Sequence, residues 1–282
     1  MAESAPQLPD DIATTVERAL KEDVGSGDLT AELIPAGAAA EARLTARTDI
    51  VLCGRAWFDE VFRQLDPTVS VSWHAADGDT VSAGATVCTI EGPARPILTG
   101  ERTALNFLQT LSGTATTVSA YVRTIAGTTA RLLDTRKTLP GLRLAQKYAV
   151  RCGGGENHRK GLYDAILIKE NHIAAAGGIG PAVEATRRHG VPVEVEVESL
   201  EQLGVALDAG ADRILLDNFS VEALRDAVRM RDARPVPDIE LEASGGIGLE
   251  NLREIAETGV DFISIGGLTK NLTAADFSLR FL

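Results

Sequence analysis

Polar residues and glycines follow six short apolar runs in the second half of the chain. The runs are RLLDT (131–135), AILIKE (165–170), VEVEVES (193–199), RILLDN (213–218), IELEAS (239–244) and FISIGG (262–267). In α/β barrels, the residues that carry the chemistry lie at the carboxyl ends of the strands. One polar residue at a strand end is usually a solvated or capping group. Because the same arrangement follows six successive runs, we expect an active site at this edge.

Four cations that could bind an anion lie in one basic segment, and they are Arg136, Lys137, Arg159 and Lys169. Residues 131–172 contain nine Lys or Arg and four acidic residues, so this segment has a net charge of +5 and the rest of the chain −17. Arginine presents a planar fork that matches carboxylate or phosphate, and lysine presents a point charge. A solvated helix face could also explain the segment. A pocket for a small, highly charged anion is favoured because a local positive field concentrates such substrates.

Two acids and two glycine pairs complete the set of strand-end residues. Glu198 and Asp217 would repel an anionic substrate unless a divalent cation bridges them, and Mg²⁺ is commonly held by one or two carboxylates plus substrate phosphates. Ser244-Gly245-Gly246 and Gly266-Gly267 are candidates for gripping a phosphate through main-chain N–H groups. A single Gly-Gly is more often only a turn. Two pairs after successive late strands are typical of the phosphate site of barrel enzymes.

The elements that would position these residues alternate between strand and helix. Helical patterns cover roughly 179–189, 200–209, 221–231 and 249–258, with Ser199 and Ser220 at expected N-caps. Strand–helix repetition predicts a parallel sheet, either doubly wound or barrel-like. The GxGxxG fingerprint of dinucleotide-binding folds is missing from the sequence, and residues 113–267 are fewer than the about 250 of a full eight-fold barrel. An open, incomplete barrel is therefore expected.

The first part of the chain has a different pattern. A helix is expected within 1–22 after Pro9-Asp10-Asp11, and strand-like alternation covers 39–53 and 69–91. Residues 101–126 are expected to form one long helix or two stacked helices, with Gly113 as the favoured break. The stretch DGDTVSAGATVCTIEG resembles biotinyl and lipoyl carrier domains, but residues 64–100 lack the lysine that such carriers modify. We therefore expect an α/β N-terminal domain over 1–112, to which 268–282 return, and a barrel domain over 113–267.

Composition excludes several other classes of protein. The chain has 282 residues and a net charge of −12, which argues against general nucleic-acid binding. An apolar run of 18 residues is missing, so no membrane span is expected, and the N-terminus has no signal-peptide pattern. Three cysteines cannot all pair, which favours a reduced, cytoplasmic location.

The motifs as a whole resemble one enzyme family, the quinolinate phosphoribosyltransferases. The resemblance rests on DTRKTLPGLRLAQKYAVRCGGGENHRKGLYDAILIKENH (134–172), ERTALNFLQTLSGTAT (101–116), VEVEVESLEQL (193–203), ILLDN (214–218), EASGGI (242–247) and ISIGGLT (263–269). It implies an N-terminal α/β sandwich domain and an open, about seven-stranded α/β barrel. It also implies that quinolinate and phosphoribosyl pyrophosphate react to give nicotinate mononucleotide, pyrophosphate and CO₂ in NAD biosynthesis. Magnesium is the implied cofactor, and a homodimer or higher homo-oligomer with shared active sites is the implied assembly.

The resemblance also implies roles for individual residues. Lys137, Glu198 and Asp217 are the implied catalytic residues, with Glu198 and Asp217 on the ribose hydroxyls and the metal. The other implied substrate-binding residues are Arg102, which reaches a partner's site, Thr135, Arg136, His158, Arg159 and Lys169 around quinolinate, and Ser244, Gly245, Gly246, Ile265, Gly266 and Gly267 around the 5′-phosphate. His172 could orient its loop or be purely structural, and both readings stay open.

Two alternative functions remain at this stage. One is a related phosphoribosyltransferase that acts on another small acid such as nicotinate, although a single carboxylate would need fewer cations than this chain supplies. The other is a non-catalytic sensor of phosphorylated metabolites, which predicts the loss of Lys137, Glu198 or Asp217. All three residues are present, which favours an enzyme.

Overall fold

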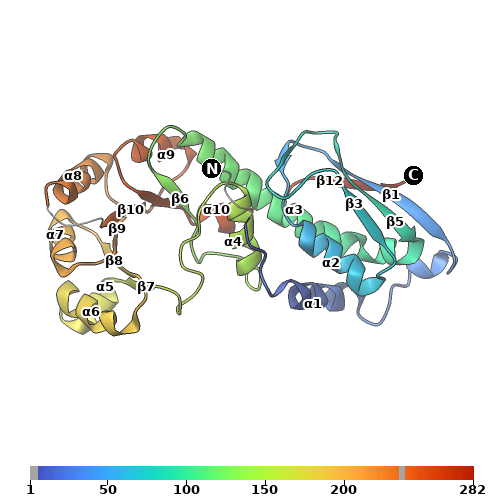
Figure 1. Cartoon of the computed structure of the whole chain (residues 1–282), viewed down its shortest axis with the longest axis horizontal. Coiled ribbons are helices and arrows are strands. Elements are labelled where there is room, and N and C mark those ends of the chain that lie inside the picture. The colour runs from blue at the N-terminus through green and yellow to red at the C-terminus, as the bar shows by residue number, and fades with distance from the viewer. Residues whose placement is uncertain (1–5, 235–238) are drawn as a thin grey trace. The chain divides into compact units, whose positions relative to one another are not determined.

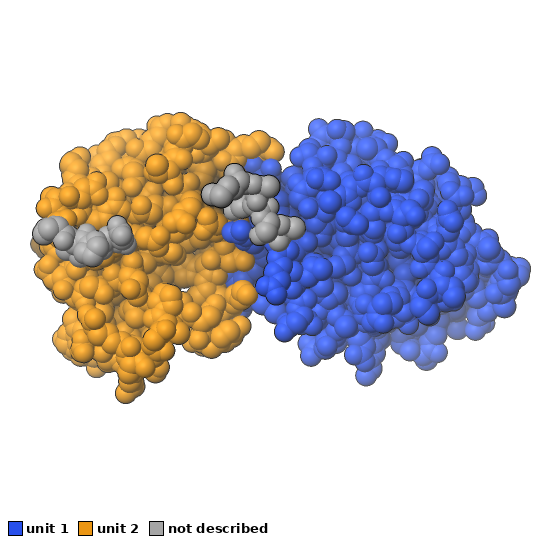
Figure 2. Space-filling model, in the orientation of Figure 1, with its two compact units in different colours: residues 1–119, 138–154, 268–282 blue, residues 120–137, 155–267 orange. Residues whose placement is uncertain are grey.

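The computed structural model describes residues 6–234 and 239–282, which fall into two compact units (Figures 1 and 2). Unit 1 comprises residues 1–119, 138–154 and 268–282, and unit 2 comprises residues 120–137 and 155–267. Residues 113–119 and 138–154, which the sequence analysis assigned to the barrel domain, belong to unit 1.

Unit 1 is built on a four-stranded antiparallel sheet with the order β12-β1-β5-β3. Its strands are β1 (Ala39–Ala46), β3 (Ser70–Trp73), β5 (Thr86–Pro93) and β12 (Phe277–Phe281), and β2 (Ile50–Val51) pairs with β4 (Thr80–Val81). Its helices are α1 (Ile12–Val24), η1 (Ala31–Leu33), α2 (Arg55–Leu65), α4 (Arg143–Cys152) and most of α3 (Ala94–Thr124). The pairing of β12 with β1 brings the last strand of the chain against the first, as Figure 1 shows.

The core of unit 1 depends on α2, a helix that the sequence analysis did not assign. Trp57, Phe58, Val61 and Phe62 are all buried, and their spacing puts them on one face of the helix. They form one cluster with buried residues of α3 such as Leu108 and with the strand residues of the sheet. A helix of only eleven residues therefore supplies three of the largest buried side chains of the chain.

Helix α3 runs through Gly113 without interruption, so the break expected there is wrong. It is one helix of 31 residues. A Cβ on Gly113 would lie 2.2 Å from the carbonyl oxygen of Thr273, and the Ala275 amide donates to the Gln109 carbonyl at 2.9 Å. This glycine lets a returning segment approach the helix closely, and it does not end the helix. Although α3 is long, no helix of the described residues is apolar enough over its length to cross a membrane.

Unit 2 contains a parallel sheet of six named strands in the order β6-β11-β10-β9-β8-β7. They are β6 (Arg131–Leu133), β7 (Ile166–Ile168), β8 (Val193–Val197), β9 (Arg213–Asp217), β10 (Glu240–Ser244) and β11 (Phe262–Ser264), one in each of the six runs. Beside the edge strand β6, Leu133 and Glu156 form an isolated parallel bridge. The open α/β sheet is confirmed, and the segment at Glu156 adds one short extended piece to its six strands.

Helices lie along the outside of this sheet, as Figure 1 shows. They are α5 (Glu170–Ala176), α6 (Ile179–Thr186), η2 (Arg187–His189), α7 (Leu200–Ala209), α8 (Val221–Asp232) and α9 (Leu249–Ala256), and the four-residue α10 (Gly267–Lys270) follows β11. The two expected N-caps are confirmed, because the hydroxyls of Ser199 and Ser220 accept from the amides of Gln202 and Ala223 at 3.2 Å. Each cap begins a helix immediately after a strand end and so fixes the backbone there.

Replacing Gly113 by alanine tests the close approach at α3. Alanine normally stabilises a helix interior by about 1 kcal/mol relative to glycine, but here its Cβ would overlap a backbone oxygen. We expect Gly113→Ala to lower the free energy of unfolding by about 1–3 kcal/mol, as measured by urea unfolding. Gly180→Ala in α6 is the matched control, since a Cβ there meets no atom within 4 Å. A Gly113→Ala protein as stable as the control would contradict this packing.

Candidate active site

The strands of unit 2 present polar residues at alternate positions on one side of the sheet. Alternate residues of a strand face the same side. On three neighbouring strands the residues of this side, all polar except Leu215, are Glu194, Glu196 and the following Glu198 (β8), Arg213, Leu215 and Asp217 (β9), and Glu240, Glu242 and Ser244 (β10). The register pairs Arg213 with both Glu194 and Glu240, and Asp217 with Ser244. Glu198 follows β8 directly and belongs to the level of Asp217 and Ser244. The parallel register itself therefore brings these three strand-end residues together.

Solvent exposure varies along this side of the sheet. Glu242 is fully buried and Glu194 is 6% exposed, whereas Asp217 is half-buried and Glu198 is exposed. Glu240, at the amino end of β10, has a side chain that is 37% exposed. The buried acids therefore lie between two more exposed ends of the polar side, and the carboxyl end is accessible to a ligand.

Lys137 and Thr135 lie next to the glycine at the end of β11. Strand β11 pairs with β6, the Lys137 amide donates to the Thr135 hydroxyl at 3.1 Å, and a Cβ on Gly266 would lie 2.8 Å from Cδ of Lys137. Glycine is therefore needed at 266 for the lysine side chain to lie over the backbone. Ile265 is held by its amide, which donates to the Leu133 carbonyl at 3.0 Å. Two sequence-distant parts of the predicted site are adjacent here.

A second pair of strand ends meets at Asp217 and Gly245. Asn218 has a positive φ of 56°, and its amide donates to the Ser244 carbonyl at 2.9 Å. Its side-chain amide donates to Oδ2 of Asp217 at 2.7 Å. A Cβ on Gly245 would lie 2.2 Å from Oδ1 of Asn218. Gly245 and Gly246 both have a positive φ, so this turn needs glycine for its backbone conformation and for room.

The cations of the basic segment come from two places in unit 2. Arg136 follows β6, and Arg159 lies in the loop before β7. Burial and the neighbouring charge of Arg136 lower the pKa of Arg159, while Glu194 and Asp164 act in the opposite direction. The charge of Arg136 therefore acts on Arg159, and a bound anion would offset both charges.

Lys169 ends β7 and forms an ion pair with Glu196 on β8. Its side chain is 44% exposed. The Lys169 amide donates to Nδ1 of His172 at 3.0 Å, so His172 caps the start of α5. This contact gives His172 a structural role.

A buried cluster that the sequence analysis missed lies beneath the strand ends. Nε2 of His158 is 2.8 Å from Glu194 and 3.6 Å from Glu242, and Nη1 of Arg213 is 3.4 Å from Glu242. Burial and the charge of Glu194 raise the pKa of Glu242 to about 8, against the opposing effects of His158, Ser264 and Arg213. Burial also raises the pKa of Glu194. The alternating acids of VEVEVES and IELEAS were the available signal, but only the strand ends were taken as functional.

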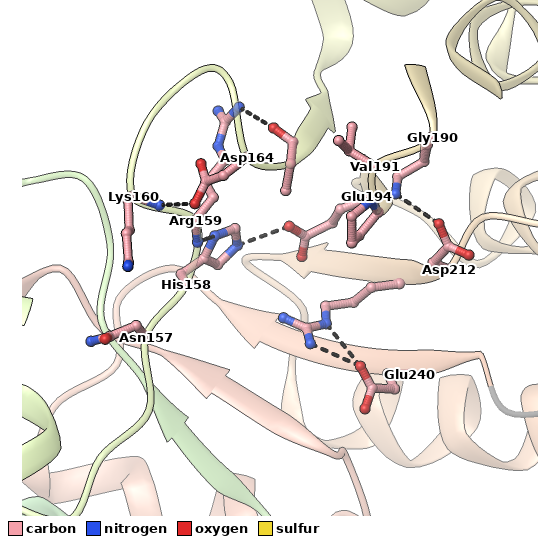
Figure 3. A pocket seen from close by; sticks show the side chains of 14 residues that line it. Asn157, His158, Arg159, Lys160, Asp164, Gly190, Val191, Glu194, Asp212 and Glu240 are labelled. Carbon is pink, nitrogen blue, oxygen red and sulfur yellow. Dashed lines mark hydrogen bonds and ion pairs between the residues drawn. The ribbon is translucent and has the colours of Figure 1, made fainter. Parts of the chain in front are cut away.

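A cavity of about 780 Å³ opens at the opposite, amino ends of β8, β9 and β10. Figure 3 shows His158 and Glu194 pointing toward each other in it, with Asp212 and Glu240 further along. Its charged lining is mixed, since Arg159, Lys160 and Arg213 face Asp164, Glu194, Asp212 and Glu240, and both Arg213 and Glu240 are already paired. Because the strand-end acids and glycine turns lie at the carboxyl ends of the strands, we take those ends as the candidate site, while Arg159 also lines this cavity.

Arg102, the remaining predicted substrate-binding residue, lies in unit 1, exposed on α3. The two predicted metal ligands are Glu198 and Asp217. Glu198 and Asp217 have carboxylate oxygens, which Mg²⁺ prefers, and they follow neighbouring strands at the exposed end. Neither carboxylate is part of an ion pair within residues 6–234 and 239–282. The donor set therefore fits a magnesium ion shared with substrate oxygens.

Comparison with known proteins gives a consistent result over the whole chain. Residues 28–112 and 114–280 match the models for the N-terminal and C-terminal domains of quinolinate phosphoribosyl transferase. A Mycobacterium leprae relative, described as nicotinate-nucleotide pyrophosphorylase (carboxylating), is 43% identical over 274 residues, covering 94% of this chain and 95% of the relative. A Bacillus subtilis relative is 44% identical over 261 residues, covering 92% of this chain and 89% of the relative. The structure of the nicotinate-nucleotide pyrophosphorylase from Francisella tularensis superimposes with a TM-score of 0.94 at 46% identity and covers both chains completely.

The buried carboxyl of Glu242 predicts a specific dependence of stability on pH. An unfolded glutamate loses its proton near pH 4.3, whereas the folded Glu242 keeps its proton to about pH 8. Between these values unfolding releases a proton, so this group lowers the free energy of unfolding as pH rises. Glu242→Gln removes that loss. We expect its stability relative to the wild type to rise from pH 5 to pH 8 and then level off, as measured by urea unfolding.

Glu240→Gln is the matched control, because Glu240 lies on the same side of the same strand with a side chain 37% exposed. Its difference from the wild type should change little over this pH range. Parallel stability curves for Glu242→Gln and the wild type would contradict a protonated Glu242.

Proposed function

The chain belongs to the quinolinate phosphoribosyltransferase family, and from this we propose that it transfers the phosphoribosyl group of phosphoribosyl pyrophosphate to quinolinate. Loss of a carboxyl group as CO₂ accompanies the transfer and gives nicotinate mononucleotide and pyrophosphate. The reaction is a step of NAD biosynthesis. The observation that supports the proposal is the set of strand ends suited to a phosphate and a metal, together with the cations Arg136 and Arg159, where burial and the charge of Arg136 lower the pKa of Arg159.

Arg136 and Arg159 bind the two carboxylates of quinolinate in this proposal. Each guanidinium can donate two parallel hydrogen bonds to one carboxylate. Their mutual repulsion in the free protein is relieved when a dianion binds between them. Lys169 adds a third positive charge directly after β7, where an ion pair with Glu196 holds the lysine side chain in place.

The glycine turns after β10 and β11 bind the 5′-phosphate of the co-substrate. Ser244, Gly245 and Gly246 form one turn, and Ile265, Gly266 and Gly267 form the other. Gly245 and Gly246 both have positive φ angles, and main-chain N–H groups in such a turn can bind a phosphate. Lys137, which lies over Gly266, is near both this phosphate and the departing pyrophosphate. Its charge offsets the negative charge that develops on the leaving group.

Glu198 and Asp217 stabilise the ribose as the pyrophosphate leaves. Departure of the pyrophosphate places positive charge on the ring, and two carboxylates at the exposed end of β8 and β9 favour that charge electrostatically. They would also hold the ribose hydroxyls and a Mg²⁺ ion, which would supply positive charge to offset the negative charge of the leaving group. The Asn218 side chain fixes the orientation of Asp217 through its hydrogen bond to Oδ2.

The order of bond changes needs no protein nucleophile. The anomeric carbon loses its bond to pyrophosphate, and the pyridine nitrogen of quinolinate forms a new bond to it. The ring then carries a positive charge, which accepts the electron pair left when the adjacent carboxylate departs as CO₂. A proton takes the place of that carboxylate on the ring. The site therefore has to supply charge and orientation, which its cations, acids and glycine turns do.

Family membership suggests how the protein assembles, and its cysteines suggest where it is located. We infer a homodimer or higher homo-oligomer in which Arg102 reaches the quinolinate site of a partner subunit. The three cysteines, Cys53, Cys88 and Cys152, are all unpaired, which supports a reducing compartment such as the cytoplasm.

An assay of the purified protein tests the proposed reaction. With quinolinate, phosphoribosyl pyrophosphate and Mg²⁺, we expect nicotinate mononucleotide and CO₂ in equal amounts, with loss of activity on adding EDTA and recovery with excess Mg²⁺. Nicotinate in place of quinolinate is the control substrate and should yield far less nucleotide. Folded protein that releases no CO₂ would rule out the reaction, and turnover of nicotinate alone would identify a sister enzyme.

Arg159→Ala tests the carboxylate assignment. Removing one partner of a buried charge pair costs about 2–5 kcal/mol, which corresponds to quinolinate binding at least about 30-fold weaker. Isothermal titration calorimetry with quinolinate measures the change directly. Arg188→Ala, on the exposed turn η2, removes the same charge outside the site and is the control. Quinolinate affinity within a few-fold of the wild type would show that Arg159 does not bind a carboxylate.

Mixed oligomers test the shared site. Arg102→Ala and Lys137→Ala subunits should each be nearly inactive alone. When they are unfolded and refolded together, a fraction of the sites combines an intact Arg102 with an intact Lys137 from two subunits, and part of the activity returns. Verified mixed oligomers without regained activity would place both residues in the site of one subunit or remove Arg102 from it.

A further inference from the structure

Both ring nitrogens of His158 are already engaged within unit 2. Nδ1 accepts a hydrogen bond from the Arg159 amide at 2.7 Å, so Nδ1 carries no proton. Nε2 lies 2.8 Å from Oε2 of Glu194 and therefore donates to this carboxylate. These two contacts favour a ring that carries its proton on Nε2 and accepts at Nδ1, whereas the family resemblance alone implied that His158 is a carboxylate ligand.

The surroundings of this ring are unfavourable for a substrate carboxylate. Glu194 and Glu242 both lie within 3.6 Å of Nε2, and one buried oxygen of each carboxyl has no hydrogen-bond partner. Arg213 lies 3.4 Å from Glu242. A further carboxylate at Nε2 would displace Glu194 or lie against it, and like charges at that distance repel each other strongly where they are poorly solvated.

The same contacts fasten the loop that carries Arg159. The His158 amide donates to Oδ1 of Asp134 at 2.9 Å, and the side chain of Asn157 donates to Oδ2 at 2.7 Å. Asp134 is fully buried directly after β6. Arg159 itself donates from Nη1 to the Ala165 carbonyl at 3.2 Å. The backbone of this loop is therefore hydrogen-bonded to Asp134 after β6, and the imidazole of His158 connects the loop to Glu194 on β8 and lies near Glu242 on β10.

We propose that His158 is a positioning residue, whose neutral imidazole anchors the Arg159 loop to Glu194 so that Arg159, and not His158, binds the substrate's carboxylate. The proposal deepens the proposed function and rests on it for its kinetic consequences. In this proposal Glu194 touches no substrate and is a positioning residue by the same argument. The alternative reading is a metal site, because ligand atoms of His158, Glu194 and Glu242 lie within 4.8 Å of one another. The 2.8 Å contact has the length of a hydrogen bond, and Arg213 already supplies a positive charge.

Nitrogen NMR of the free protein tests the anchor without any assay of activity. The chain has four histidines, so the His158 signals in histidine-labelled protein are identified by their loss in His158→Gln. At pH 7.5 we expect a neutral ring protonated on Nε2, and the same form when quinolinate is saturating. A charged ring, a proton on Nδ1, or a quinolinate-induced change of protonation would overturn the proposal. So would a signal that shifts when EDTA removes a stoichiometric metal ion, measured by mass spectrometry.

A double-mutant cycle tests the functional consequence. We expect His158→Ala and Glu194→Gln each to lower kcat/KM for quinolinate about 10- to 100-fold, mainly through KM. Because both substitutions break the same contact, the kcat/KM of the double variant should be at most about threefold below that of the less active single variant. Additive losses, or Glu194→Gln within twofold of the wild type beside a 100-fold loss for His158→Ala, would show direct binding by His158.

Two further measurements keep this cycle interpretable. His189→Gln, on the exposed turn η2, is the matched control and should keep the wild-type kcat/KM. Thermal unfolding of every variant verifies that it is folded, and His158→Gln, whose amide can still donate to Glu194, replaces His158→Ala if the latter is unfolded. Wild-type protein inactive with quinolinate would overturn the proposed function, while the NMR result would still decide the role of the ring.

Discussion

Two carboxyl groups buried beside one guanidinium constrain the whole of unit 2. Glu194 and Glu242 project from strands separated by β9, and Arg213 projects from β9 between them. Burying an unpaired charge is costly, whereas a paired and hydrogen-bonded one is tolerated. A shift of any of these strands by one residue would turn its charged side chain to the other face of the sheet. The buried group thus penalises wrong registers, and the correct register brings Glu198, Asp217 and Ser244 to one level.

The site is a consequence of that register and of how exposure changes along it. The same alternation that buries Glu194 places Glu198 four residues further on, exposed to solvent, directly after the same strand. The buried acids stabilise the sheet through ion pairs, and the exposed strand ends are where we expect the ligand. His158 connects the two, because its ring reaches Glu194 while its own backbone leads directly into Arg159. Structure and binding therefore use one continuous polar face.

Much of the fold followed from local sequence signals. All six strands of unit 2 lie in the predicted runs, because short β-rich stretches were bounded by caps such as Ser199 and Ser220 that act within a few residues. Gly113 was misread, because only the distant Thr273 explains why a glycine stands inside a helix. Helix α2 went unassigned, although its apolar residues share a face. Glycine and apolar spacing are ambiguous until the packing partner is known.

The candidate site was predicted unevenly for similar physical reasons. Strand-end residues such as Asp217 could be recognised because parallel strands share a carboxyl edge. Glu194 and Glu242 could not, because alternating acids in a strand usually indicate a solvated face, and only the packing around this sheet buries them. Arg102 was indicated by the family resemblance alone. The interior contacts of His158 depend on residues about 36 and 84 positions away, beyond any local pattern.

A crystal structure of the protein with quinolinate is the most direct measurement of the central claim. The account predicts the ligand at the carboxyl ends of the strands, with its carboxylates about 3 Å from the guanidinium groups of Arg136 and Arg159 and with the His158–Glu194 contact intact. Quinolinate bound in the cavity at the amino ends, beside Asp212 and Glu240, or held by a ring nitrogen of His158, would contradict it.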